Sequence, residues 1–242
     1  VRNTLLAGIS HDFRTPLTAI IGAATTVLTQ GGQITPEQHE ALLHNLLDQA
    51  RRLQSLTSDL LDLARLQEGA VQPACEWCPV GELVRDALAM AQGSMDADRV
   101  DVQAAEDDIV WCDPRLLTQA LTNLLINAVQ HSPPQGRIAL AVRLGEEAWT
   151  LSVRDQGSGL VPGREAEVFR KFYRDAMPTP SILPPTRASA ASLTGTGLGL
   201  AICEVVARLH GGHISAHSDG GAVFEMRIPW PASEPRPMDL PE

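Results

Sequence analysis

Residues 10–17 read Ser-His-Asp-Phe-Arg-Thr-Pro-Leu and lie in a segment whose apolar residues recur every three or four positions. This spacing predicts a helix that runs to about Leu28, with its apolar side chains on one face. His11 is two positions from both Ile9 and Phe13, which places it about 200° from each of them around the helix. The sequence therefore predicts that His11 faces solvent.

His11 has three neighbours that are unusual around an ordinary surface histidine. Asp12 places an acid beside it, Thr15 presents a hydroxyl one turn further on the same face, and Pro16 removes a backbone donor and bends the helix. An imidazole that acts as a nucleophile needs an adjacent base to take its proton, and Asp12 can supply that base. A lone exposed histidine is usually an ordinary surface residue, but this combination favours a reactive one.

A second helix is expected after a turn at Gly31 and Gly32. Thr35 suits the N-cap and Pro36 the first helical position. A broad leucine stripe then continues until just before Gly69, at Leu42, Leu43, Leu46, Leu47, Leu53, Leu56, Leu60, Leu61 and Leu63. Each helix would be roughly 40 to 45 Å long, and a single hairpin would leave much of the stripe uncovered. A second copy would cover it in a four-helix bundle, so we expect a homodimer.

The composition excludes several classes of function. The chain has 242 residues and a net charge of −10, the wrong sign for a nucleic-acid partner. Lys171 is the single lysine, so phosphate sites that need a lysine elsewhere are excluded. No apolar run reaches the roughly 18 to 20 residues of a membrane span, so we expect a soluble fragment. The start at Val1 indicates a piece of a longer protein.

The cysteine spacing does not favour a metal or redox site. Cys75 and Cys78 make one Cys-x-x-Cys pair, but Cys112 and Cys203 do not supply the second pair that a structural zinc site needs. We therefore expect reduced cysteines, as in a cytosolic protein.

The sequence pattern changes after Gly69, which divides the chain into a first domain over 1–70 and a second over 71–231. Residues 175–194 hold several prolines and no periodicity, so a long mobile loop is expected there, and 232–242 is expected to be a disordered tail. Periodicity in the second domain predicts, in chain order, a helix over 115–131, strands over 137–144 and 149–155, a helix over 198–210, and strands over 213–218 and 222–229.

The helix expected over 115–131 has one apolar side and one uncharged polar side. Its apolar side carries Leu117, Leu121, Leu124, Leu125 and Ala128. Its polar side carries Gln119, Asn123, Asn127 and His131, each four residues apart. A face that meets only water usually carries Lys and Glu, so this row indicates a face covered by something polar. Asn amide oxygens are hard ligands that suit Mg²⁺ bound to phosphates.

Asp155 continues the buried side of the strand expected over 149–155, where a carboxylate needs a partner. Gly157 and Gly159 follow it, and their missing side chains allow a flat group to approach the backbone. An adenine would fit there, with its exocyclic amine donating to Asp155. The alternative is a turn-initiating aspartate before glycines.

Glycines also precede the helix expected over 198–210. They are Gly195, Gly197 and Gly199. The free N–H groups and the positive dipole end of this helix can bind an anion, although the spacing does not match a dinucleotide-binding fingerprint. Phe169, Phe172 and Arg174 lie just before the expected loop, and plain core packing is the alternative for the two phenylalanines.

The order and spacing of these motifs resemble the sensor histidine kinases of two-component systems. Residues 10–17 resemble the phosphoacceptor box of that family. Four further motifs resemble, in order, its N box, first glycine box, F box and second glycine box, at 123–132, 155–159, 169–174 and 195–200. The resemblance covers roughly residues 1–230. Within the family, 2–17 and 76–80 are most similar to the potassium-responsive sensor kinases of the Kdp type.

The resemblance implies an α+β fold. An antiparallel helical hairpin, which forms a four-helix bundle in the dimer, would precede an α/β sandwich ATP-binding domain of the histidine kinase, gyrase and Hsp90 type. His11 would accept the γ-phosphoryl group of ATP, Asp12 would be the base, and Thr15 would orient water during dephosphorylation of the partner. Asn127 would hold Mg²⁺. The other implied nucleotide-binding residues are Asn123, His131, Asp155, Gly157, Gly159, Phe169, Arg174, Gly195, Gly197 and Gly199.

The implied function is ATP-dependent autophosphorylation and transfer to an aspartate in the receiver domain of a response regulator, together with phosphatase activity. The chain would be the cytoplasmic part of a sensor anchored in the inner membrane. Gln130 stands where a lysine is common, and His131 where an aromatic residue often lies, so a degenerate nucleotide-binding scaffold is one alternative. Another ATPase of the same fold is a second, but such ATPases lack the hairpin that carries His11.

Overall fold

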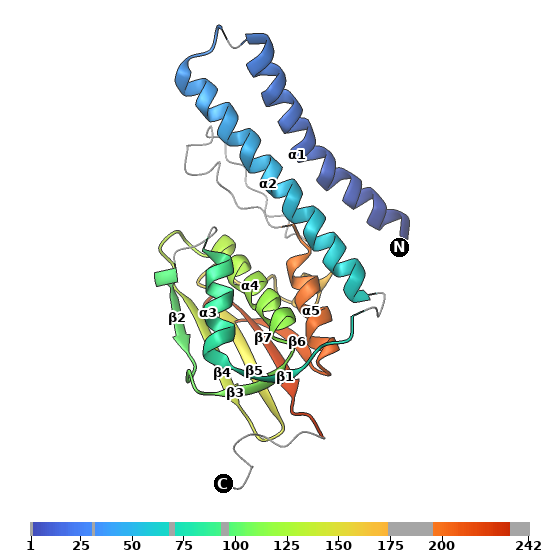
Figure 1. Cartoon of the computed structure of the whole chain (residues 1–242), viewed down its shortest axis with the longest axis vertical. Helices are drawn as coiled ribbons and strands as arrows, with labels where there is room; N and C mark the ends of the chain where they lie inside the picture. Colours follow the sequence, from blue (N-terminus) through green and yellow to red (C-terminus); the bar gives the residue numbers. More distant parts are fainter. Residues whose placement is uncertain (1, 31, 68–70, 93–96, 174–195, 233–242) are drawn as a thin grey trace. The chain divides into compact units, whose positions relative to one another are not determined.

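A computed structural model of the chain describes residues 2–30, 32–67, 71–92, 97–173 and 196–232 (Figure 1). The chain divides into two compact units, Val1–Ala64 and Arg65–Glu242. The expected loop at 175–194 and nearly all of the expected tail at 232–242 lie outside the described residues.

The first unit is a hairpin of two long helices, α1 (Arg2–Gln30) and α2 (Pro36–Gln67), whose last residues belong to the second unit. The start of α2 is closed by a reciprocal pair of hydrogen bonds. The Gln38 N–H donates to Thr35 Oγ1 at 3.3 Å, and the Thr35 N–H donates to Gln38 Oε1 at 3.0 Å. This capping box satisfies two donors that a helix start leaves free, and it confirms the predicted start at Pro36.

The hairpin leaves a broad apolar surface uncovered. Ala23, Leu56 and Leu63 are buried. Among the side chains that the structure describes in the hairpin, six large apolar ones are exposed, namely Leu17, Ile21, Leu28, Leu43, Leu47 and Leu61. This agrees with the expectation that one hairpin cannot cover its own leucine stripe. Among the described residues, no helix combines the length and the hydropathy that a bilayer crossing requires.

The second unit is built on a mixed five-stranded sheet with the order β2-β4-β5-β7-β6. The strands are β2 (Val100–Gln103), β4 (Ile138–Leu144), β5 (Ala148–Arg154), β6 (His213–Ser218) and β7 (Ala222–Pro229). β2 pairs with β4 in parallel, and all the other neighbours are antiparallel. A separate antiparallel pair joins β1 (Glu76–Pro79) to β3 (Ile109–Cys112).

Three helices, α3 (Val80–Ala91), α4 (Pro114–His131) and α5 (Gly199–Leu209), lie over one face of this sheet (Figure 1). Alternate strand residues point into the layer between them, and Trp149, Leu151 and Val153 of β5 are almost fully buried there. The opposite side of β5 and β7 carries mostly exposed or half-buried residues, and Ala148 and Val223 are the buried residues on that side. The structure thus confirms an α/β sandwich that follows a helical hairpin in the sequence. Two short 3₁₀ helices, η1 (Ala97–Arg99) and η2 (Glu167–Phe169), complete the elements.

Candidate active site

His11 lies on α1 with its side chain largely exposed, as predicted. Its Nδ1 atom is 3.4 Å from Asp12 Oδ1, and the Thr15 hydroxyl donates to the His11 carbonyl at 3.2 Å. When Nδ1 carries the proton that faces Asp12, Nε2 keeps a lone pair for attack on an electrophile. The hydroxyl of Thr15 still has acceptor capacity for water on the same face.

The uncharged row of α4 lies where the sequence predicts it. Gln119, Asn123 and Asn127 are half-buried and His131 is exposed, while the leucines on the other side of the helix are buried. The Asn123 Nδ2 group donates to the Gly199 carbonyl at 3.4 Å. The row therefore faces the start of α5, the helix that the second glycine box precedes.

Asp155 follows β5 directly, and its carboxylate is fixed from one side. Oδ1 accepts the N–H groups of Gly157 at 2.8 Å and Ala222 at 2.9 Å. The Asp155 N–H in turn donates to the Ala222 carbonyl at 2.9 Å. Oδ2 is buried and has no hydrogen-bond partner among the described residues. Because a buried carboxylate oxygen without a donor is costly, this atom is suited to accept a donor from a ligand.

The backbone around Asp155 is held against the end of α4. A Cβ atom on Gly157 would collide with the His131 carbonyl oxygen, so only glycine allows this approach. The Gln156 N–H donates to Ser132 Oγ at 3.2 Å, and Gln156 Oε1 accepts the Arg137 N–H at 3.0 Å. The first glycine box and the end of the N box are therefore brought together, as their proposed roles require.

The second glycine box meets the F box by a backbone contact. Gly197 has a φ of 71°, and its carbonyl accepts the Phe172 N–H at 2.8 Å. Phe172 has a φ of 60°, which is rare for a bulky residue. Phe169 is buried with its ring 6.2 Å from that of Phe224 in an edge-on arrangement, which is the core-packing alternative.

Not every predicted site residue is brought to this region. Arg174 and Gly195 lie outside the described residues. His11, Asp12 and Thr15 belong to the other unit. Gly159 has a φ of 75° and packs near Ser218, whose hydroxyl accepts the Leu160 N–H at 2.8 Å. In the described part of the chain no cluster of three His, Cys, Asp or Glu side chains can hold a metal ion.

Sequence reasoning missed the residues that orient Asp155. Ala222 supplies an N–H to its carboxylate, and a Cβ atom on Gly221 would collide with the Asp155 carbonyl oxygen. The double glycine at 220–221 before a predicted strand is the signal that was available, since consecutive glycines there indicate a close backbone approach. Ser132 and Gln156 were also missed, and no spacing rule links them.

Comparison with known proteins agrees with this arrangement. Residues 1–69 match the family model of the His Kinase A (phospho-acceptor) domain. Residues 112–232 match the model of the histidine kinase-, DNA gyrase B- and HSP90-like ATPase. This chain belongs to the histidine kinases. The second unit thus carries the ATP-binding domain of that family.

Individual histidine kinases cover nearly the whole chain. The sensor protein KdpD of Escherichia coli is 34% identical over 235 residues, which are 95% of this chain and 24% of KdpD, so the similarity to Kdp-type sensors is confirmed. The Acinetobacter baumannii histidine kinase AdeS has the same fold, with a TM-score of 0.69 and 22% identity over 90% of this chain and 97% of AdeS. Full-length ShkA in complex with AMPPNP has a TM-score of 0.59 and 25% identity over 95% of this chain and 46% of ShkA. The chain spans about a quarter of the length of the KdpD proteins it matches.

Proposed function

We propose that this histidine kinase transfers the γ-phosphoryl group of ATP to His11, and from there to an aspartate in the receiver domain of a response regulator. The observation that carries the proposal is the exposed imidazole of His11 with Nδ1 beside the Asp12 carboxylate. It lies in the unit that matches the phospho-acceptor domain, and the same chain continues into the ATP-binding domain.

The first step forms one bond and breaks another. The Nε2 lone pair of His11 attacks the γ-phosphorus, and the bond from that phosphorus to the bridging oxygen breaks, with its electron pair leaving on ADP. Asp12 stabilises the positive charge that develops on the ring by accepting the Nδ1 proton. The products are ADP and a phosphohistidine, which then gives its phosphoryl group to the carboxylate of the regulator.

The nucleotide residues of the second unit support the binding part of the proposal. Asp155 Oδ2, which has no hydrogen-bond partner in the described part of the chain, offers the acceptor that the exocyclic amine of adenine needs. Full-length ShkA, a relative of the same fold, was solved in complex with AMPPNP, an ATP analogue. Asn127 is half-buried on the row that faces α5, and its amide oxygen is a hard ligand of the type Mg²⁺ takes. A Mg²⁺ ion held there would supply positive charge to the phosphates.

The assembly and location of the protein are part of the same proposal. The exposed apolar face of the hairpin supports a homodimer with a four-helix bundle. Because the KdpD relatives are about four times longer than this chain, we place it as the cytoplasmic part of a larger sensor attached to the inner membrane. Thr15 lies on the same face of α1 as His11, and its hydroxyl would orient water when the regulator is dephosphorylated.

The test is transfer of label from ATP. With γ-labelled ATP and Mg²⁺, the chain should acquire a phosphate that acid removes and alkali does not, and His11→Gln should abolish it. His44→Gln is the matched control, because His44 is also an exposed helical histidine beside an acid, Glu40, at 3.7 Å. Label that persists in His11→Gln contradicts the assignment. Nucleotide binding without any label would instead favour the degenerate scaffold.

A further inference from the structure

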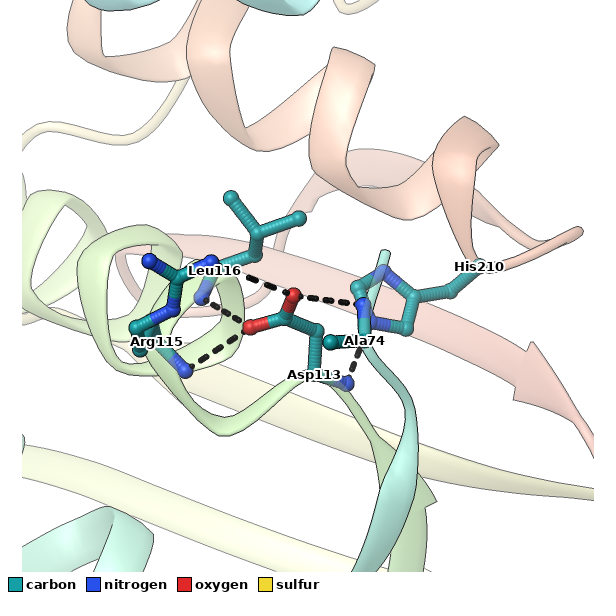
Figure 2. A network of polar contacts seen from close by, with 5 residues as sticks. All are labelled: Ala74, Asp113, Arg115, Leu116 and His210. Carbon is teal, nitrogen blue, oxygen red and sulfur yellow. Dashed lines mark hydrogen bonds and ion pairs between the residues drawn. The ribbon is translucent and has the colours of Figure 1, made fainter. Parts of the chain in front are cut away.

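A polar cluster lies where the chain enters the second unit, and it involves none of the residues assigned above. Figure 2 shows Asp113, the N-cap of α4, at its centre. Asp113 Oδ1 accepts the N–H groups of Arg115 at 3.0 Å and Leu116 at 3.2 Å, and Oδ2 accepts the N–H of Ala74 at 2.9 Å. The carboxylate is buried. It therefore joins the first turn of α4 to the linker, which we define as the described residues 71–75 between α2 and β1.

His210, the C-cap of α5, completes the cluster and is held in one protonation state. The Asp113 N–H donates to the Nε2 atom of His210 at 2.9 Å (Figure 2). The Nδ1 atom of His210 lies 2.8 Å from the Val206 carbonyl. Since Nε2 accepts a hydrogen bond and Nδ1 faces an acceptor, the ring is neutral with its proton on Nδ1. Burial lowers the pKa of His210 below its usual value of 6.5, against smaller opposing effects of the Val206 carbonyl and Asp113.

The cluster lies at the opposite end of α4 from the nucleotide residues. Three polar contacts tie α4 to the antiparallel α5: Asp113 to His210 at one end, the Cys203 thiol to the Ala120 carbonyl at 3.3 Å, and Asn123 to Gly199 at the other end. Asn123 and Asn127 follow Asp113 by 10 and 14 residues, or about 15 to 21 Å along a helix. The cluster can therefore open without removing a direct ligand of the nucleotide.

We propose that Asp113 and His210 form a latch that positions the linker for phosphoryl transfer, and that protonation of His210 opens it. The proposal rests on the proposed function. His11 and the nucleotide residues belong to separate units. The phosphoryl group can pass from ATP to His11 only when the chain that connects the units lets the two sites approach each other. The contact at Ala74 fixes the linker at one point of the second unit. A proton on Nε2 would turn an acceptor into a donor facing the Asp113 N–H, which breaks the contact.

Charged and titratable groups lie on each of the elements packed around His210. Asp113 is the negative charge nearest to His210. The guanidinium group of Arg115, in α4, lies 3.9 Å from the Oδ2 atom of Asp113. On α5 itself, Arg208 pairs with Glu204 at 3.4 Å. The other elements packed against α5 are β6, η2 and β7. β6 carries His213 and His217. η2 carries Glu167, which pairs with Arg164 and Arg170. β7 carries Glu225 and Arg227, and Arg227 pairs with Glu147. Cys75 in the linker and Cys112 at the end of β3 are further titratable neighbours of Asp113.

Four variants separate the functions of the latch. His210→Gln offers an acceptor that does not titrate, whereas His210→Leu keeps bulk and removes the acceptor. Asp113→Ser keeps an N-cap side chain for α4 but is too short to hold Ala74. His213→Gln is the control, because it removes an exposed histidine three residues away.

The first measurement is hydrogen exchange at the Ala74 and Asp113 amides of the whole chain, at about pH 7.5 and about pH 5.5. Protection in the wild type should fall on acidification by about tenfold more than intrinsic exchange explains. It should be low at both pH values in His210→Leu and pH-independent in His210→Gln, while His213→Gln should follow the wild type. Asp113→Ser should expose Ala74 alone. Equal protection in His210→Leu and the wild type would overturn the latch.

The second measurement is the split between kcat and KM of autophosphorylation. Opening the latch should lower kcat about tenfold and leave KM for ATP unchanged, because positioning is lost and binding is not. His210→Gln should remove the part of the acid-side loss of kcat that arises from His210, while the part that arises from protonation of the His11 nucleophile should remain. An unchanged kcat in His210→Leu, with the amides exposed, would overturn the positioning role. Absence of label on His11 in every variant would instead refute the proposed function, and the exchange data would still test the latch.

Discussion

The two oxygens of Asp155 have different surroundings, and that difference carries chemical information. Oδ1 accepts two backbone N–H groups, so the plane of the carboxylate is fixed before any ligand arrives. Oδ2 is left as a buried acceptor. A preorganised group of this kind discriminates between ligands that offer a donor and ligands that offer an acceptor.

Asp155→Asn should invert this preference. The amide oxygen of asparagine can take over both backbone N–H groups, which places its NH₂ group at the position of Oδ2. ATP binding should weaken by about tenfold to a hundredfold, while inosine triphosphate, which carries an oxygen instead of the amine, should gain relative to ATP. Competition titrations with both nucleotides measure the ratio, and thermal unfolding should change little. Unchanged ATP affinity would remove Asp155 from base recognition.

Asp12 and Thr15 are predicted to act in different reactions. The Asp12 carboxylate is beside Nδ1 of His11, whereas the Thr15 hydroxyl donates to a backbone carbonyl and lies one turn away. Asp12→Asn should therefore slow phosphorylation of His11 first, by about tenfold to a hundredfold. Thr15→Ala should keep autophosphorylation near the wild-type rate and slow dephosphorylation of the regulator.

Two time courses check this division, one for phosphate entering the kinase and one for phosphate leaving the regulator. Thr18→Ala is a matched control, since Thr18 is an exposed threonine on the same helix. If Thr15→Ala slows both reactions equally, Thr15 only supports the helix around Pro16.

Elements with a clear periodicity were predictable from the sequence, and short exposed ones were not. β6 and β7 match the predicted bounds, α4 differs by one residue at its start, and α5 differs by one residue at each end. These elements were predictable because each has one face that is more buried than the other and repeats with a fixed period. β2 is an edge strand with almost no buried residue, so it shows no alternation. β1 and β3 are four residues each. α3 begins at Val80, directly after β1 ends at Pro79, so no turn sequence separates the two elements and α3 was not predicted.

The β1–β3 pair places cysteines where burial controls their chemistry. Burial raises the pKa of Cys78 to about 11, and it raises the pKa of Cys112 further still. The Cys75 thiol is only half-buried, and its pKa is raised by burial and by Asp113. At about pH 8, iodoacetamide should therefore modify Cys75 first, while Cys78, Cys112 and Cys203 should react only after unfolding.

The same shifts predict how stability depends on pH. Thiols whose pKa is raised in the folded chain ionise more readily when it unfolds, so stability should decline as pH rises above the ordinary value of 9.0. Mass spectrometry of alkylated peptides and denaturant titrations at about pH 8 and about pH 10 test both statements. Cys112→Ala should reduce the alkaline loss, and rapid alkylation of native Cys112 would contradict the argument.

For the molecule as a whole, sequence spacing located residues on one element but not contacts between distant ones. The row from Gln119 to His131 was predictable because every fourth residue of a helix shares a face. Asp113 and His210 are 97 residues apart, and Ala222 lies 67 residues after Asp155. Such pairs depend on the order of strands in the sheet, which no local period encodes. This is why the candidate site was predictable in part and the latch was not.

The uncovered face of the hairpin leads to a prediction about the whole assembly. Leu43 and Leu47 are exposed by 47% and 45% and lie one turn apart on α2, where burial against a second hairpin would contribute about 1.5–3 kcal/mol for each side chain. In a two-fold dimer each substitution occurs twice.

The double variant Leu43→Glu and Leu47→Glu should therefore be a monomer by size-exclusion chromatography with light scattering, whereas Asn45→Glu, at an exposed polar position between them, should remain a dimer. ATP binding should be unchanged in both variants, because the nucleotide residues belong to the second unit. A double variant that stays dimeric would place the dimer interface elsewhere, and the exposed leucines at 43 and 47 would then have to be covered by a partner other than a second copy.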